Sequence, residues 1–241
     1  DTDVANYGIN RPSDYCLASP NLQIITTCFK LGDQSTGEGS VVSHNYNGGG
    51  LVNDEATDIE VGPVWGLAYQ RSTDTIFASA FAKRQAEYGP GGAGQIYAIS
   101  SAGVVSQFVD IPNVGTDIHS ADPVGNPYSQ DSTFYDSPGK QSLGDMDISE
   151  DGSTLWVINL NIRQLYSVDI TTATVNPPHG VIGESLTNCA ATNGVYRPFG
   201  LGVRDGFIYV GGVCTNENAA LGTTAGLQAY VFSYNPVGGA V

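Results

Sequence analysis

Basic side chains are scarce in this sequence. Its 241 residues include nine lysines and arginines against 24 aspartates and glutamates, which gives a formal net charge of -15 at pH 7. A surface of this sign repels phosphate backbones and anionic lipid headgroups. The composition therefore argues against nucleic acid as a partner. It favours a soluble secreted protein, and the excess of carboxylates could also recruit calcium, which prefers oxygen ligands.

Long apolar runs are also missing. No stretch approaches the roughly 20 apolar residues that a membrane-spanning helix requires, so we expect no membrane insertion. Only 14% of the residues are charged and a single methionine is present, whereas the chain holds 31 glycines, 12 prolines and 13 tyrosines. This balance of turn formers and strand formers over helix formers predicts an all-β fold.

The four cysteines form no CxxC pair and have no histidines at zinc-like spacing, so a thiolate metal site is not indicated. An even number of cysteines in an acidic, glycine-rich chain favours two disulfides and an oxidising compartment. Among the three possible connectivities, Cys16 to Cys28 and Cys189 to Cys214 close the shortest loops. Four buried free thiols in a cytosolic protein are the alternative.

Three segments share one layout, in which an alternating strand, a turn carrying an aspartate and a second strand follow one another. They are WGLAYQRSTDTIFASAF (65–81), GDMDISEDGSTLWVINL (144–160) and FGLGVRDGFIYVGGV (199–213). A further strand with a tyrosine ends each unit, at 94–100, 163–170 and 227–235. A meander of about four antiparallel strands, repeated with long variable loops, is typical of a β-propeller blade.

We therefore expect one β-propeller-like domain over 1–241, with about four blades or more in a closed, partial or open arrangement. The blade-like units lie approximately at 14–58, 59–117, 143–182 and 195–241, and a polar insertion without periodicity lies at 118–142. A β-sandwich with Greek-key links is the alternative fold.

Aromatic residues fall into two groups. Those in the repeat strands, including Trp65, Tyr69, Phe207 and Tyr209, are expected to pack in the core between blades. A second group lies in presumed loops and is free to contact a sugar or a protein partner, unless the loops fold back onto the propeller and bury them. These possible ligand-contacting aromatics are Tyr88, Tyr128, Phe134 and Tyr135.

Two aspartates distinguish the second repeat from the others. When the repeats are aligned, Asp145 and Asp147 occupy the positions of Gly66 and Ala68 in the first repeat and of two glycines in the third. Alternate residues of a strand share a face, so the two carboxylates repel each other unless a cation or hydrogen-bond donors intervene. A calcium ion could serve this purpose. The alternative is that both carboxylates cap backbone N–H groups in a turn-rich protein.

The stretch GPVWGLAYQRSTDTIFASAFAKRQAEYGPGGAGQIYAI (62–99) resembles a propeller-like region of large bacterial cell-surface proteins, which often carry SdrD-like B repeats. LGDMDISEDGSTLWVINL (143–160) and RPFGLGV (197–203) fit the same layout, so the resemblance covers roughly residues 16–234. It implies an extracellular or cell-surface location and a scaffolding or adhesive role, and it carries over no catalytic residue.

The leading functional hypothesis is a secreted or cell-surface scaffold or adhesive protein of β-propeller type. It would act by binding a protein or glycan partner or by self-assembly, as an adhesin module or a subunit of an extracellular fibre. One alternative is a calcium-dependent propeller hydrolase of the lactonase or phytase type, for which Asp145 and Asp147 are the candidate ligands. A carbohydrate-binding module without turnover is the other. The sequence thus favours binding over catalysis and leaves an enzyme open.

Overall fold

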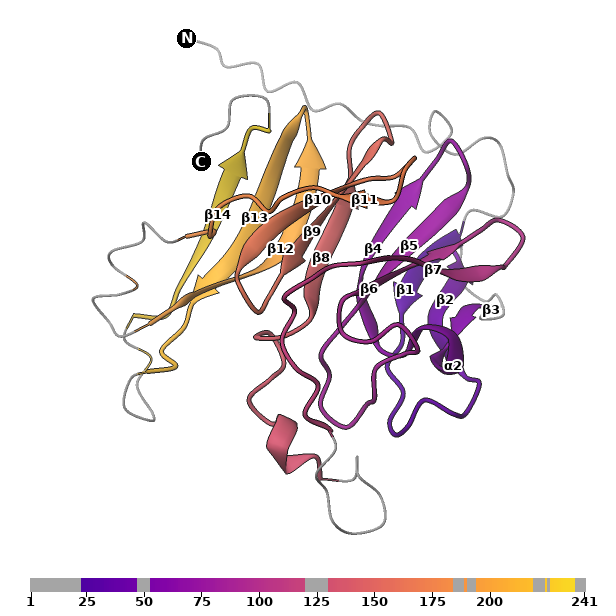
Figure 1. Ribbon diagram of the computed structural model, residues 1–241, viewed down its shortest axis with the longest axis horizontal. Coiled ribbons are helices and arrows are strands. Elements are labelled where there is room, and N and C mark those ends of the chain that lie inside the picture. Colours follow the sequence, from indigo (N-terminus) through magenta and orange to yellow (C-terminus); the bar gives the residue numbers. More distant parts are fainter. Residues whose placement is uncertain are drawn as a thin grey trace.

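The computed structural model describes residues 23–46, 53–119, 130–183, 189, 194–218, 224 and 226–236. Its strands form four antiparallel sheets, and in each sheet the strands follow chain order. Figure 1 shows the sheets side by side in a row, from the indigo first sheet to the yellow fourth sheet at the opposite end. No helix in the described part of the chain is long and apolar enough to span a membrane.

The two outer sheets have three described strands and the two inner sheets have four. The first sheet comprises β1 (Gln23–Thr27), β2 (Gly39–Asn45) and β3 (Asn53–Thr57). The second comprises β4 (Val64–Gln70), β5 (Thr75–Ala80), β6 (Gln95–Ile99) and β7 (Val105–Asp110). The third comprises β8 (Leu143–Ile148), β9 (Thr154–Asn159), β10 (Gln164–Asp169) and β11 (Thr174–Val175). The fourth comprises β12 (Tyr196–Arg204), β13 (Phe207–Cys214) and β14 (Gln228–Tyr234), and two short helices, α2 (Asp58–Val61) and η2 (Ser132–Phe134), lie in connections.

The prediction of an all-β fold built from propeller blades is confirmed. Each sheet is a simple meander, and each lies inside one of the four units 14–58, 59–117, 143–182 and 195–241. The β-sandwich alternative is wrong, because the strands form four separate sheets in place of two with Greek-key links. Of the insertion at 118–142, residues 120–129 lie outside the described part.

Turn chemistry fixes the register of the hairpins. The β12–β13 hairpin pairs Arg204 with Phe207 and leaves Asp205 and Gly206 as a two-residue loop. Both loop residues have positive φ, 52° and 76°. Asp-Gly is the preferred sequence for such a turn, whose twist matches that of the strands it joins. The loop therefore sets which residues of β12 and β13 face the third sheet.

An apolar cluster fills each of the three spaces between neighbouring sheets. Val41 and Ala56 of the first sheet pack with Val64 and Tyr97 of the second. The second space contains ten buried residues, Ala68, Phe77, Ile96, Ile111, Leu143, Met146, Leu155, Val157, Tyr166 and Val168. The third contains Trp156, Ile158 and Leu165 of the third sheet together with Ile208 and Val210 of the fourth. Each interior sheet therefore buries both of its faces against neighbouring sheets.

The first strands of the last three sheets run beside one another, β4 next to β8 and β8 next to β12. Each has a register irregularity at the same place, between Val64 and Leu67, between Leu143 and Met146, and between Pro198 and Gly200. Such bulges re-aim side chains locally. The three equivalent positions at the bulges are occupied by Trp65, Gly144 and Phe199.

Candidate functional site

Asp145 and Asp147 join β8 to β12. One oxygen of Asp145 accepts a hydrogen bond from the backbone N–H of Leu201 at 3.1 Å, and one oxygen of Asp147 accepts from that of Val203 at 2.7 Å. The second oxygen of each aspartate accepts the N–H of its own following residue, at 3.0 and 2.8 Å. Glu150 continues the series by accepting from the N–H of Asp205 at 3.0 Å. The carboxylates thus act as acceptors for the first strand of the next sheet.

Both aspartates therefore accept hydrogen bonds from backbone N–H groups, as one of the two sequence-based alternatives expected. The N–H groups that they accept include those of a neighbouring sheet and not only those of a turn. Burial raises the pKa of Asp145, although the N–H groups of Leu201 and Met146 act in the opposite direction. Within the described residues, no group of three or more His, Cys, Asp or Glu side chains is placed to hold a metal ion. Calcium at Asp145 and Asp147 remains a prediction that only experiment tests.

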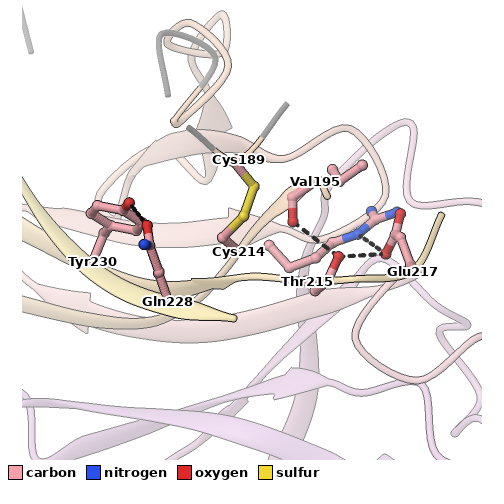
Figure 2. The surroundings of a disulfide bond; sticks show 8 residues. Cys189, Val195, Cys214, Thr215, Glu217, Gln228 and Tyr230 are labelled. Atoms are coloured by element: carbon pink, nitrogen blue, oxygen red, sulfur yellow. Dashed lines mark hydrogen bonds and ion pairs between the residues drawn. A yellow bond between two sulfur atoms is a disulfide. The ribbon is translucent and has the colours of Figure 1, made fainter. Parts of the chain in front are cut away.

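A disulfide joins Cys189 to Cys214 at the end of β13. Figure 2 shows it beside Thr215, which donates a hydrogen bond from its hydroxyl to the carbonyl of Val195 at 3.0 Å. This is one of the two short-loop pairings expected from the sequence. Cys28 forms no disulfide with a cysteine of the described residues, and its expected partner Cys16 lies outside them, so a Cys16–Cys28 bond stays a prediction.

Of the aromatic side chains expected in loops, some are buried and one is exposed. Tyr88 and Phe134 are 7% and 0% exposed and form a small cluster with Ala82, so this part of the loops folds back onto the propeller. Neither ring is available to a ligand in solvent. Tyr135 is 73% exposed, and the guanidinium of Arg84 lies 5.3 Å from its ring centre. Tyr128 lies outside the described residues.

A buried polar cluster holds the insertion against the loop after β5. The Nδ1 atom of His119 lies 2.9 Å from a carboxylate oxygen of Asp131, and the imidazole stacks on Phe134 with 3.6 Å between ring centres. The same Asp131 oxygen accepts the N–H of Gln85 at 2.6 Å. Burial, together with Asp117, raises the pKa of the neighbouring Glu87 to about 7. The cluster anchors two loops to each other.

Four aromatic rings gather where the first strands of the sheets begin, and we call them the axial aromatic cluster. They are Phe29, Trp65, Phe81 and Phe199. Trp65 of β4 meets Phe199 of β12 edge to face, with 5.2 Å between ring centres. The ring of Phe81 lies 5.5 Å from Trp65 and 5.9 Å from Phe29. The ammonium of Lys83 lies 4.9 Å from the centre of the Phe29 ring, a cation–π geometry.

Gly144 of the third sheet lies close to the backbone of β12 beside this cluster. Trp65 and Phe199 belong to the second and fourth sheets, and the equivalent bulge position in the third sheet is Gly144. A Cβ atom at Gly144 would lie 3.1 Å from the Phe199 carbonyl and 3.0 Å from Leu160. A side chain at position 144 would therefore crowd the backbone of β12 beside Phe199.

Trp65 is 41% exposed, which corrects the expectation that the strand aromatics pack in the core. Three other strand aromatics are exposed as well, namely Tyr69 at 48% and both Phe207 and Tyr209 at 39%. Alternation within a strand does not reveal which face meets another sheet, so the sequence pattern could not separate Trp65 from the buried Trp156. The repeat alignment contains the one available signal, because it places Trp65, Gly144 and Phe199 in register.

Comparison with known proteins finds relatives in Dictyostelium discoideum. The chain is 29% identical to Colossin-D over 230 residues, which is 88% of this chain and 24% of Colossin-D. It is 29% identical to Colossin-B over 218 residues, covering 87% of this chain and 5% of that protein. The chain thus spans less than a quarter of the length of these relatives. No protein-family profile matches it.

Two solved structures resemble the fold at low sequence identity. A streptogramin B lyase structure matches 81% of this chain and 47% of its own, with a TM-score of 0.41 and 9% identity. The β-propeller domain of Cps50 (Swd1) from Myceliophteria thermophila matches 82% of this chain and 66% of its own, with a TM-score of 0.33 and 12% identity.

The resemblance to bacterial surface proteins with SdrD-like B repeats is wrong, because the sequence relatives are the colossins. The residues that suggested it were a WGLAY strand, a polar turn and a glycine-rich loop. Alternating strands, polar turns and glycine-rich connections are general features of antiparallel β-proteins. They indicate the architecture and do not identify the lineage.

Proposed function

We propose that this protein is a binding module of an extracellular scaffold or adhesive protein, and that the axial aromatic cluster is its ligand-binding surface. The observation that carries the proposal is the exposure of Trp65 inside a group of four rings. An aromatic ring usually buries a large apolar area. Here the fold places Trp65 at the start of an inner strand and leaves 41% of it accessible.

A sugar ring is the ligand class that fits this surface best. The faces of aromatic rings carry partial negative charge and attract the polarised C–H groups on one side of a pyranose. The cation nearest the cluster, Lys83, already lies over Phe29. A neutral glycan also avoids the repulsion that a polyanion would meet from a chain of net charge -15.

Two further features support an extracellular setting. The Cys189–Cys214 disulfide is of a kind that persists in oxidising compartments. The strongly acidic composition suits a protein that stays soluble at high ionic strength with few lysines. A hydrolase role for Asp145 and Asp147 has less support, because all four of their carboxylate oxygens already accept backbone N–H groups.

Tryptophan fluorescence tests the proposal directly. The chain has two tryptophans, and Trp156 is only 6% exposed, so a ligand at the cluster reports through Trp65. The purified chain is titrated with neutral hexasaccharides of glucose, galactose and N-acetylglucosamine. We expect a saturable change in emission with one of them. Isothermal calorimetry should then show Trp65→Ala weakening that binding roughly tenfold or more.

Tyr69→Ala is the matched control, because Tyr69 is an equally exposed aromatic on β4 that lies outside the cluster. It should leave the affinity unchanged, and thermal melts of both variants check that each is folded. If no sugar of the panel binds, or if Trp65→Ala binds as tightly as the original protein, the axial aromatic cluster is not a glycan site.

A further inference from the structure

Two carboxyl groups meet where the connection between β5 and β6 contacts the segment that follows β7. The Glu87 side chain forms a hydrogen bond with the side chain of Asp117. Ionised carboxylates have only acceptor oxygens, so this bond requires a proton on one of the two groups. The contact therefore exists only in a protonated form, and it makes the pairing of these two segments sensitive to pH.

The surrounding groups indicate which carboxyl group holds the proton. One oxygen of Asp117 accepts the backbone N–H of His119 at 3.0 Å, and a hydrogen bond of this kind favours the ionised form. Glu87 is half-buried, and burial is the largest cause that raises its pKa to about 7. Glu87 accordingly holds the proton and donates it to Asp117, while its Oε1 atom accepts the N–H of Tyr88 at 3.3 Å.

Charged groups on the insertion favour the protonated form of Glu87. The carboxylate of Asp131 raises the pKa of Glu87 further, in the same direction as burial. This carboxylate contacts the imidazole of His119 at 2.9 Å. Arg84 lies on the same connection as Glu87, and its guanidinium donates to the backbone carbonyl groups of Gln130 and Asp131. Loss of the proton would thus place a third negative charge beside two others.

The loop between β1 and β2 contacts the same connection from the other side. The carbonyl of Gly32 accepts the backbone N–H of Glu87 at 3.0 Å. The charged side chains of this loop bond within the first sheet and its loop, since Lys30 contacts Glu38 at 2.9 Å and Asp33 accepts a neighbouring hydroxyl at 2.5 Å. This side of the connection is therefore held by a backbone hydrogen bond that does not depend on the charge of Glu87.

The Glu87–Asp117 contact lies beside the aromatic rings that pack the two loops together. The ring of Tyr88 lies 5.7 Å from that of His119 and 6.3 Å from that of Phe134, edge to face in both cases. Tyr88 follows Glu87 directly in the chain, and His119 lies two residues after Asp117. Separation of the two carboxyl groups would therefore move apart the same segments that bury these rings.

We propose that Glu87 and Asp117 form a proton-dependent latch, which holds residues 115–119 on the β5–β6 connection in acid and releases them when Glu87 ionises. The closed latch binds a proton that the open one gives up. The ratio of open to closed loops therefore increases as pH rises from 4.5 to 7 and is constant above that range. Release exposes the rings of Tyr88 and Phe134 while the sheets stay folded. The latch is independent of any ligand at the axial aromatic cluster.

Hydrogen exchange followed by mass spectrometry tests the latch in the intact protein. Peptides that cover 84–88 and 115–119 are compared at pH 5 and pH 7.5, after correction for the intrinsic exchange rate at each pH. We expect their protection to decrease about fivefold, a figure that allows for solvent screening. Glu87→Gln keeps a donor to Asp117 at every pH and should show equal protection at both. Asp136→Asn is the control, because that side chain is 85% exposed, and it should keep the fivefold change.

Low concentrations of urea distinguish release of the latch from unfolding of the whole protein. Opening of two loops exposes little surface, so exchange in 84–88 and 115–119 should respond weakly to urea. Protection of β9 should decrease as urea is added, because Leu155 and Val157 are buried between two sheets and exchange there requires unfolding.

Equal protection of the two segments at pH 5 and pH 7.5 overturns the proposal. So does a pH dependence that persists in Glu87→Gln, or a response of these segments to urea that equals that of β9. If Glu87→Gln does not fold, Asp117→Asn takes its place. This variant keeps an acceptor for the His119 N–H and removes the charge that opposes ionisation of Glu87, so it should also reduce the pH dependence.

Discussion

The carboxylate of Asp147 accepts a hydrogen bond from the backbone N–H of Val203 at 2.7 Å, and it thereby joins the first strands of two neighbouring sheets. Asp145 makes the same bond to Leu201 two residues earlier. Within a sheet, backbone carbonyl groups of the neighbouring strand accept the N–H groups of a strand. Between β8 and β12, the carboxylates of Asp145 and Asp147 accept them instead. This relationship makes the two aspartates structural residues.

Removal of the Asp147 acceptor should destabilise the protein. Asp147→Ala leaves the partly buried N–H of Val203 without its partner, at a cost of about 1–3 kcal/mol in the free energy of unfolding. Asp147→Asn keeps a carbonyl oxygen and should lose less. Urea denaturation measures both, with Asp136→Ala as the control because the Asp136 side chain is 85% exposed. Equal stability of Asp147→Ala and Asp136→Ala would contradict the acceptor role.

Calcium should have little effect on thermal stability. A ligand that binds only the native state raises the unfolding midpoint as its concentration increases. Because the oxygens of Asp145 and Asp147 are already engaged by N–H groups, we expect the midpoint after chelation to be the same with and without millimolar calcium. A calcium-dependent rise that disappears in Asp147→Asn would instead establish a metal site at this pair.

The same substitution should destabilise the protein at Gly66 of β4 and have no effect on stability at Gly202 of β12. Gly66→Ala would place a Cβ atom 2.8 and 2.9 Å from backbone atoms of Met146 and Gly144, which cannot yield without moving β8. Overpacking of this kind costs about 1–3 kcal/mol. Gly202→Ala meets no described atom within 4 Å and should leave the stability of the protein unchanged. Similar midpoints for the two variants in urea would show that β4 and β8 are less closely packed.

Protonation of Glu87 should make the protein more stable in mild acid than at neutral pH. The native pKa is about 7 and the ordinary value is 4.5. Between these two values the native state binds more protons than the unfolded state, so the free energy of unfolding decreases as pH rises from 4.5 to 7.

In Glu87→Gln, the decrease in the free energy of unfolding between pH 5 and pH 7.5 should be smaller by about 1 kcal/mol. This figure allows for solvent screening of a partly exposed group. The measurement is urea denaturation at pH 5 and pH 7.5 for both proteins. Carboxylates with lowered pKa, such as Asp58, are common to both and cancel in the comparison. An identical pH dependence for the two proteins would refute this assignment.

The Cys189–Cys214 disulfide should contribute substantially to stability. It closes a loop with a sequence separation of 25, for which restriction of the unfolded chain predicts about 3 kcal/mol. The double variant Cys189→Ser with Cys214→Ser should lose stability of this order in urea. A count of free thiols in the denatured, unreduced protein tests the second pair, since the predicted Cys16–Cys28 bond requires zero and a count of two would contradict it.

The sequence by itself determined the local structure of this protein. Alternating apolar residues, Asp-Gly at 205–206 and the three aligned repeats specify antiparallel strands joined by tight turns, because a period of two and positive φ are local properties of the chain. Loop length also favoured the pairing of Cys189 with Cys214, although it left the other connectivities open. The sequence layout did not identify the relatives of this protein, which are the colossins and not bacterial surface proteins.

Only the tertiary structure decided which strand faces meet one another. Trp65 and Trp156 occupy similar alternating strands, yet one is 41% exposed and the other 6%. The sequence left Asp145 and Asp147 open to a calcium ion or to backbone N–H groups, and the structure places N–H groups of β12 against their carboxylates. Gly66 is packed against β8, whereas a Cβ atom on the aligned Gly200 would meet no atom of the described residues within 4 Å. The difference arises because these contacts join residues more than 50 positions apart, as Asp145 with Leu201 and Gly66 with Met146 show, and no local pattern encodes which neighbour lies across each face.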